Sequence, residues 1–173
     1  MGYTIEFKGR FNLNKPLSEE HAKFLYDFSR TRHYERLFTD NDPNGLFFTD
    51  PDGIFEPSWT DLDFKEICIN GTPFDRKKYE LSKWGCIDFN NVTSGMPSFY
   101  CQWVPTEDRN AIEWDKQEKF YNAKEWLEFL IKHYLILWGY TLNGEVKVYD
   151  NDNHELGTGI LRVLNNEVFF EKF

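Results

Sequence analysis

Between residues 3 and 13 the chain alternates regularly between apolar and polar side chains. Polar residues occupy the even positions, and the odd positions hold Tyr3, Ile5, Phe7, Phe11 and Leu13. A period of two is typical of a strand with one buried face and one face in water. Half-exposed strands of this kind occur in antiparallel sheets, so the first element is predicted to belong to one.

The next segment predicts a helix that begins at Glu19. Ser18 is a favourable N-cap, and the acidic Glu19 and Glu20 suit the positive end of the helix dipole. An apolar stripe at helical spacing follows, formed by Phe24, Leu25 and Phe28. The stripe predicts that this helix packs on a sheet.

A second regular region begins near residue 99. The alternation predicts a hairpin, with Cys101 and Trp103 on one strand, Ile112 and Trp114 on the next, and turn residues between them. Asn122 is then expected to cap a second helix in a capping box with Glu125. Apolar residues repeat along this helix at helical spacing up to Gly139, a suitable left-handed stop: Leu127, Leu130, Ile131, Tyr134 and Trp138.

The last third predicts an antiparallel meander. Alternation marks a strand from Tyr140 to Val148, and strands over 158–164 and 167–173 pair across Asn165-Asn166, a turn that tolerates positive φ. The predicted fold class is α+β: an antiparallel sheet of about five or more strands, with two helices packed on one face.

Residues 39–98 interrupt this regularity with recurrent Pro and Gly. Long irregular stretches inside compact domains are often functional. We expect a single α+β domain over residues 1–173, in which 39–98 form an irregular insert. The short elements expected there are strands over 46–49, 64–69 and 86–89 and a helical turn over 76–81.

Charge and composition narrow the possible partners. The net charge is −9, which makes direct binding to nucleic acid unlikely and permits a partner with a basic surface. The chain has no signal-peptide pattern and no apolar run of transmembrane length, which predicts no membrane association. Its three cysteines lack CxxC spacing and are expected to be free thiols, so we expect a cytoplasmic location.

Metal and catalytic motifs are weak in this sequence. Asp40, Asp42 and Asn44 match the opening of a calcium loop, but Pro51 stands where the bidentate Glu belongs. Calcium binding there stays open beside an ordinary turn. No nucleophile, zinc or phosphate-loop motif occurs. The sequence therefore predicts no catalytic residue, no metal and no cofactor, and it predicts that Cys101 is a core thiol.

A basic group near the end of the first helix is the main candidate site for a small ligand. Arg32 and Arg36 are one helical turn apart with His33 between them, and they could hold a phosphate or a carboxylate. The helix dipole alone would also explain them. The insert adds aromatic residues of the type that anchors interfaces. The predicted ligand-binding residues are Arg32, Arg36, His33, Trp59 and Trp84.

Several motifs resemble a family of small acidic proteins found in bacteria and their phages. They are CQWVP from residue 101, EWD from 113, EKFY from 118, EWL from 125 and WGYTLNGEV from 138. The similarity covers about the first 36 residues and residues 95–149. It implies an intracellular protein encoded by a phage or prophage, and it implies no mechanism.

Two classes of function follow as hypotheses. The first is a non-catalytic intracellular binding protein that recognises a host or defence protein through its aromatic-rich insert and acidic surface. The alternative is a binder, or a small enzyme, of an anionic metabolite or nucleotide. It would use Arg32 and Arg36 with aromatic residues, and the enzyme version adds Glu113 or Asp115 as general base.

Overall fold

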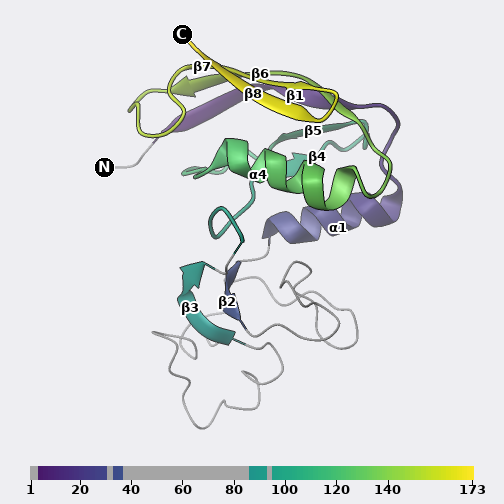
Figure 1. Cartoon of the computed structure of the whole chain (residues 1–173), viewed down its shortest axis with the longest axis horizontal. Coiled ribbons are helices and arrows are strands. Elements are labelled where there is room, and N and C mark those ends of the chain that lie inside the picture. Colours follow the sequence, from purple (N-terminus) through teal and green to yellow (C-terminus); the bar gives the residue numbers. More distant parts are fainter. Residues whose placement is uncertain (1–3, 31–32, 37–85, 93–94) are drawn as a thin grey trace. The chain divides into compact units, whose positions relative to one another are not determined.

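A computed structural model of the chain describes residues 4–30, 33–36, 86–92 and 95–173 (Figure 1). For residues 34–36 and 86–90 it describes the main chain alone. The chain divides into two compact units, one formed by Met1–Ser29 with Cys101–Phe173 and the other by Arg30–Tyr100. The single domain over residues 1–173 stays a prediction.

The first unit is built on a six-stranded antiparallel sheet. Its order is β4-β5-β1-β6-β7-β8, so the N-terminal strand lies inside the sheet and β4 and β8 lie at its edges. This confirms the predicted α+β class. The strands are β1 (Ile5–Leu13), β4 (Trp103–Pro105), β5 (Ala111–Trp114), β6 (Leu142–Asp150), β7 (Gly159–Leu164) and β8 (Glu167–Lys172).

Strand β1 has the two faces that its alternation predicted. Ile5, Phe7 and Phe11 are buried, whereas Glu6 and Lys8 on the opposite face are exposed. The strand pairs with β6 along its whole length, from Ile5 opposite Asp150 to Leu13 opposite Leu142. Because the buried side chains of β6 share the same face, the two central strands supply much of the core.

Two glycines let these central strands approach each other closely. Gly9 and Gly144 have φ values of 121° and 140°. A Cβ atom at Gly9 would lie 2.8 Å from the carbonyl oxygen of Glu145, and one at Gly144 would lie 3.0 Å from that of Arg10. Only glycine adopts this conformation without strain, so both positions require it.

Both helices lie on the same side of the sheet, as predicted (Figure 1). They are α1 (Glu19–Arg30) and α4 (Ala123–Leu130), and α4 continues as a π-helical turn, η3 (Ile131–Leu135). Helix α4 contacts both edge strands, β4 and β8, and therefore spans the sheet. Ser18 caps α1, because its Oγ accepts the N–H of His21 at 3.1 Å. No helix in the described residues has the length and apolar character needed to cross a membrane.

The predicted capping box at Asn122 is wrong. Asn122 adopts a left-handed conformation with φ 57°, and its side chain makes no capping hydrogen bond. Its N–H instead donates to both carboxylate oxygens of Glu155, at 3.1 and 3.2 Å. A carboxylate from a distant loop therefore replaces Glu125 at this helix N-terminus, where negative charge is favourable.

Trp103 and Ile112 of the tryptophan hairpin lie in the core, as the sequence predicted, whereas Trp114 is half-buried. Trp103 is 1% exposed and its Nε1–H donates to the carbonyl of Ala123 at 2.8 Å. The rings of Phe7, Phe11 and Phe120 contact it edge-on, with centroids 5.1–5.4 Å away. The hairpin is thereby joined to the start of α4.

Two predicted chain reversals are confirmed. Gly139 has φ 83° and ends the second helix, and its N–H donates to the carbonyl of Ile136 at 3.0 Å. Asn165 and Asn166 both have positive φ, 47° and 70°, as a two-residue hairpin requires. The turn also holds the start of β6, because Asn166 Oδ1 accepts the N–H of Leu142 at 2.7 Å.

The second unit contains a two-stranded antiparallel sheet of β2 (Tyr34–Arg36) and β3 (Cys86–Val92). The strand expected over 86–89 is confirmed and extends to Val92. The strands expected over 46–49 and 64–69, and the helical turn over 76–81, lie outside the described residues.

The loop after β6 is organised by one buried carboxylate. Asp150 accepts four backbone N–H groups at 3.1–3.3 Å, those of Asp152, His154, Glu155 and Gly157. Burial by itself would raise the pKa of Asp150, but these four donors together outweigh it and lower the pKa. The ionised form therefore stabilises the loop.

We predict that Asp150→Asn lowers the free energy of unfolding by about 2 kcal/mol at pH 7, because the amide NH₂ would face two N–H donors and leave them unsatisfied. A lowered folded-state pKa gives stability that is present above the unfolded pKa and lost as pH falls. The gap between wild type and variant should therefore shrink below about pH 4, as followed by urea unfolding. Asp152→Asn is the control, and an equal cost there would contradict the special role of Asp150.

Candidate functional site

The predicted ligand-binding residues are only partly described. Arg32, Trp59 and Trp84 lie outside the described residues, as do Asp40, Asp42 and Asn44 of the possible calcium loop. For Arg36, at the end of β2, only the main chain is described. His33 is buried, and its backbone N–H donates to the carbonyl of Phe99 at 2.9 Å. Whether these residues come together is therefore untested, and both the site and its ligand stay predictions.

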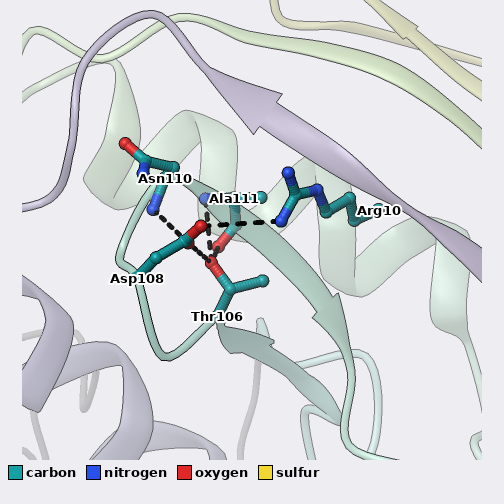
Figure 2. A network of polar contacts seen from close by, with 5 residues as sticks. All are labelled: Arg10, Thr106, Asp108, Asn110 and Ala111. Atoms are coloured by element: carbon teal, nitrogen blue, oxygen red, sulfur yellow. Dashed lines mark hydrogen bonds and ion pairs between the residues drawn. The ribbon is translucent and has the colours of Figure 1, made fainter.

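The turn of the tryptophan hairpin is a closed polar network (Figure 2). The hydroxyl of Thr106 donates to Asp108 Oδ1 at 2.6 Å, and the N–H of Asn110 donates to the same oxygen at 3.0 Å. Arg10 Nη1 lies 3.7 Å from Asp108 Oδ2. The Thr106 hydroxyl, more than any other group, lowers the pKa of Asp108. This carboxylate is an ionised acceptor that fixes the turn.

Cys101 and Asp115 are the two ionisable groups of the hairpin whose pKa values are raised by burial. The Cys101 thiol is fully buried, which raises its pKa far above the ordinary value, and Sγ lies 3.8 Å from the carbonyl oxygen of Trp103. Burial also raises the pKa of Asp115 to about 6, although a hydrogen bond from the N–H of Gln117 acts to lower it. The thiol therefore stays protonated at neutral pH, as expected of a core cysteine rather than a nucleophile.

A different group of side chains meets where α1 passes the end of η3. The hydroxyl of the buried Tyr140 accepts the N–H of Ser18 at 3.1 Å and lies 2.9 Å from Nδ1 of His21. Because the hydroxyl accepts from Ser18, its own proton is available to Nδ1. Lys15 Nζ lies over the Tyr140 ring, 5.1 Å from its centroid.

His21 is also held by stacking. Its imidazole lies parallel to the indole of Trp138, with centroids 4.0 Å apart and planes 4° apart. Trp138 in turn contacts Phe24 edge-on and Tyr134 in a stacked arrangement, each at 5.4 Å. His21 and Trp138 are half-buried, so this stack presents two fixed aromatic rings at the surface.

A π-helical turn and two exposed apolar residues precede Trp138 in the chain. In η3 the N–H of Ile136 donates to the carbonyl of Ile131, five residues back, at 3.0 Å. The added residue turns the following side chains by roughly 100° around the helix axis. Ile136 and Leu137, which follow this turn, are 52% and 75% exposed. We call His21, Ile136, Leu137 and Trp138 the His21–Trp138 surface.

One pattern in the sequence indicates this surface. Ile136 and Leu137 are large apolar residues that fall off the stripe through Ile131, Tyr134 and Trp138. Residues of that type outside the buried face of a helix indicate an exposed apolar patch. The contact with His21 could not be predicted, because it joins residues over a hundred positions apart.

Potential metal ligands do not gather in the described part of the chain. There, no three residues among His, Cys, Asp and Glu lie close enough together to hold a metal ion. Comparisons with protein-family models, curated proteins and solved structures found no match to this chain.

We predict that Tyr140→Phe lowers the free energy of unfolding by about 1–2 kcal/mol, because the N–H of Ser18 and Nδ1 of His21 both lose their partner. Urea unfolding measures the loss, and the ¹⁵N shifts of the imidazole report the change at Nδ1. Tyr149→Phe is the matched control, with an expected change within about 0.5 kcal/mol. Unchanged imidazole shifts in Tyr140→Phe would contradict the described hydrogen bond.

We predict that Asp115→Asn stabilises the protein by about 1 kcal/mol above pH 7, a value reduced for the partial exposure of the carboxyl. The raised pKa means that the folded state binds more protons than the unfolded state, so the wild type loses stability as pH rises from about 4 to about 6. The advantage of the variant should vanish near pH 4 in chemical denaturation. Glu118→Gln controls for the loss of one charge, and an advantage that persists at pH 4 would contradict the assignment.

Proposed function

We propose that this chain is a non-catalytic, intracellular protein-binding module. The observation that carries the proposal is the His21–Trp138 surface, where Ile136 and Leu137 are exposed and directly precede Trp138, whose indole stacks on the His21 imidazole. Large apolar side chains gathered at a surface are characteristic of interaction sites. A host or defence protein is the expected partner, in keeping with the resemblance to phage-type proteins.

The rigidity of this surface favours binding. The Trp138 ring is fixed by Phe24, Tyr134 and His21, and His21 is fixed by Tyr140. A side chain that is already ordered loses little conformational entropy on association. Tryptophan and tyrosine are enriched among the residues that contribute most to binding energy at interfaces. Trp138 is therefore a suitable anchor.

Charge specifies the partner further. The net charge is −9, and the exposed Glu19 and Glu20 precede His21 in the first turn of α1. A partner with an apolar centre and a basic rim would complement this surface, as a protein that normally binds nucleic acid would. The aromatic-rich insert over residues 39–98 is proposed to contribute the remaining specificity.

The ionisable groups of the first unit support a non-catalytic function. The carboxylates of Asp108 and Asp150 accept hydrogen bonds from groups in their own loops. Burial keeps the Cys101 thiol protonated. These groups stabilise the fold, and their roles are complete without a substrate.

We predict that Leu137→Asp abolishes capture of the partner. Immobilised wild-type protein should enrich at least one basic protein from a host-cell lysate at low salt, and the variant should bind it about tenfold less or worse, because a charge replaces an interface anchor. Quantitative mass spectrometry of the bound fractions measures the difference.

Leu164→Asp is the matched control, since Leu164 is a leucine of comparable exposure at the end of β7. It should capture the same partner as wild type. Enrichment of nothing by the wild type, or equal enrichment by Leu137→Asp, would reject the proposal.

A further inference from the structure

Strand β8 is an unprotected edge of the main sheet. In the part of the chain that the structure describes, no strand pairs with its outer side. The opposite edge strand, β4, has three residues and ends in Pro105, and both features discourage further pairing. Strand β8 has six residues and no proline, so its free edge can accept another strand.

The hydrogen-bond pattern identifies which backbone groups face outward. Leu164 and Glu167 close the hairpin, and the N–H of Phe173 donates to the carbonyl of Thr158 at 3.0 Å. Antiparallel hydrogen bonds alternate along a strand, so the odd-numbered residues of β8 bond to β7. The free edge therefore carries the N–H and C=O groups of Val168, Phe170 and Lys172.

Two phenylalanines stand exposed on the outer face of the same strand. Phe169 is 48% exposed and Phe173, which follows β8 directly, is 76% exposed. They alternate with Glu167 and Glu171, which are also exposed. An edge that combines free backbone groups with exposed aromatic side chains is suited to strand addition.

The sequence of β8 is complementary to itself in one antiparallel register. With Phe170 opposite Phe170 of the second copy, Val168 lies opposite Lys172. The three residues with free backbone groups, Val168, Phe170 and Lys172, then all form hydrogen-bonded pairs. Phe169 then lies opposite Glu171, and Glu167 opposite Phe173. A shift by two residues in either direction would place Glu171 opposite a Glu of the other chain, which is unfavourable.

We infer that two copies of this chain form a symmetric dimer through their β8 strands, which joins the two sheets into one. In this register Phe169 lies diagonal to Phe169 and Phe173 of the second copy, so four aromatic rings gather on the outer face. A contact of this kind is isologous and closes on itself, because the same strand is used by both copies.

Lys172 does not block this edge. A Cβ atom added at Gly157 would lie 2.7 Å from Cε of Lys172, so the lysine side chain runs along the adjacent loop. The β8 interface shares no residue with the His21–Trp138 surface. Self-association and partner binding can therefore be tested separately, and either can be absent while the other is present.

The test is sedimentation velocity of the full chain over a concentration series. Wild type should shift from monomer to dimer as concentration rises. Val168→Pro should weaken the dimer about tenfold or more, because it removes an outward N–H while every β7–β8 hydrogen bond remains. Sedimentation of wild type as a monomer throughout the series would overturn the inference.

A matched pair of charge variants tests the register. Phe169→Glu places like charges opposite Glu171 in both symmetric pairs and should weaken the dimer about tenfold, whereas Phe169→Lys places opposite charges there and should retain it. The double variant Phe169→Glu with Glu171→Lys should restore dimerisation. Circular dichroism confirms folding of each variant. A dimer equally strong in Val168→Pro and Phe169→Glu would show that another surface is used.

Discussion

The position of the Trp103 indole between the sheet and the second helix is the contact on which the first unit depends. The indole N–H donates a hydrogen bond to the carbonyl of Ala123, the first residue of α4, and the ring packs against Phe7 and Phe11 of β1. Each aromatic contact contributes about 0.5–1.5 kcal/mol beyond burial, and the hydrogen bond about 1 kcal/mol. The contact therefore fixes the start of α4 against the sheet.

A second link joins the C-terminal loop to the same helix. Asp150 ends β6 and gathers the N–H groups of the following loop, among them that of Glu155. The Glu155 side chain then reaches the N–H of Asn122 ahead of α4. The helix is therefore held from the hairpin side by a tryptophan and from the loop side by a carboxylate. Trp138, beyond the end of η3, is held by its own ring contacts with Phe24, Tyr134 and His21.

Local patterns allowed most of this fold to be predicted, and non-local contacts account for what was missed. The alternation in β1 and the Asn165-Asn166 turn depend on neighbouring residues, so the sequence contains enough information to place them. The cap at Asn122 depends on Glu155, 33 residues away, and no local pattern encodes that choice. The π-helical turn likewise has no sequence signature in the apolar stripe. The residues predicted as a ligand site belong to the second unit, and three of them, Arg32, Trp59 and Trp84, lie outside the described residues.

The charge of the chain places opposite demands on the two proposed surfaces. Two copies that each carry −9 repel one another, so a self-complementary edge must avoid close pairs of like charge. The β8 register meets that condition by setting each glutamate opposite a phenylalanine. A basic partner at the His21–Trp138 surface is instead attracted by the same charge. Screening acts over about 8 Å at physiological ionic strength. Added salt therefore favours the self-paired form and weakens the hetero-complex, which makes ionic strength the variable that separates the two associations.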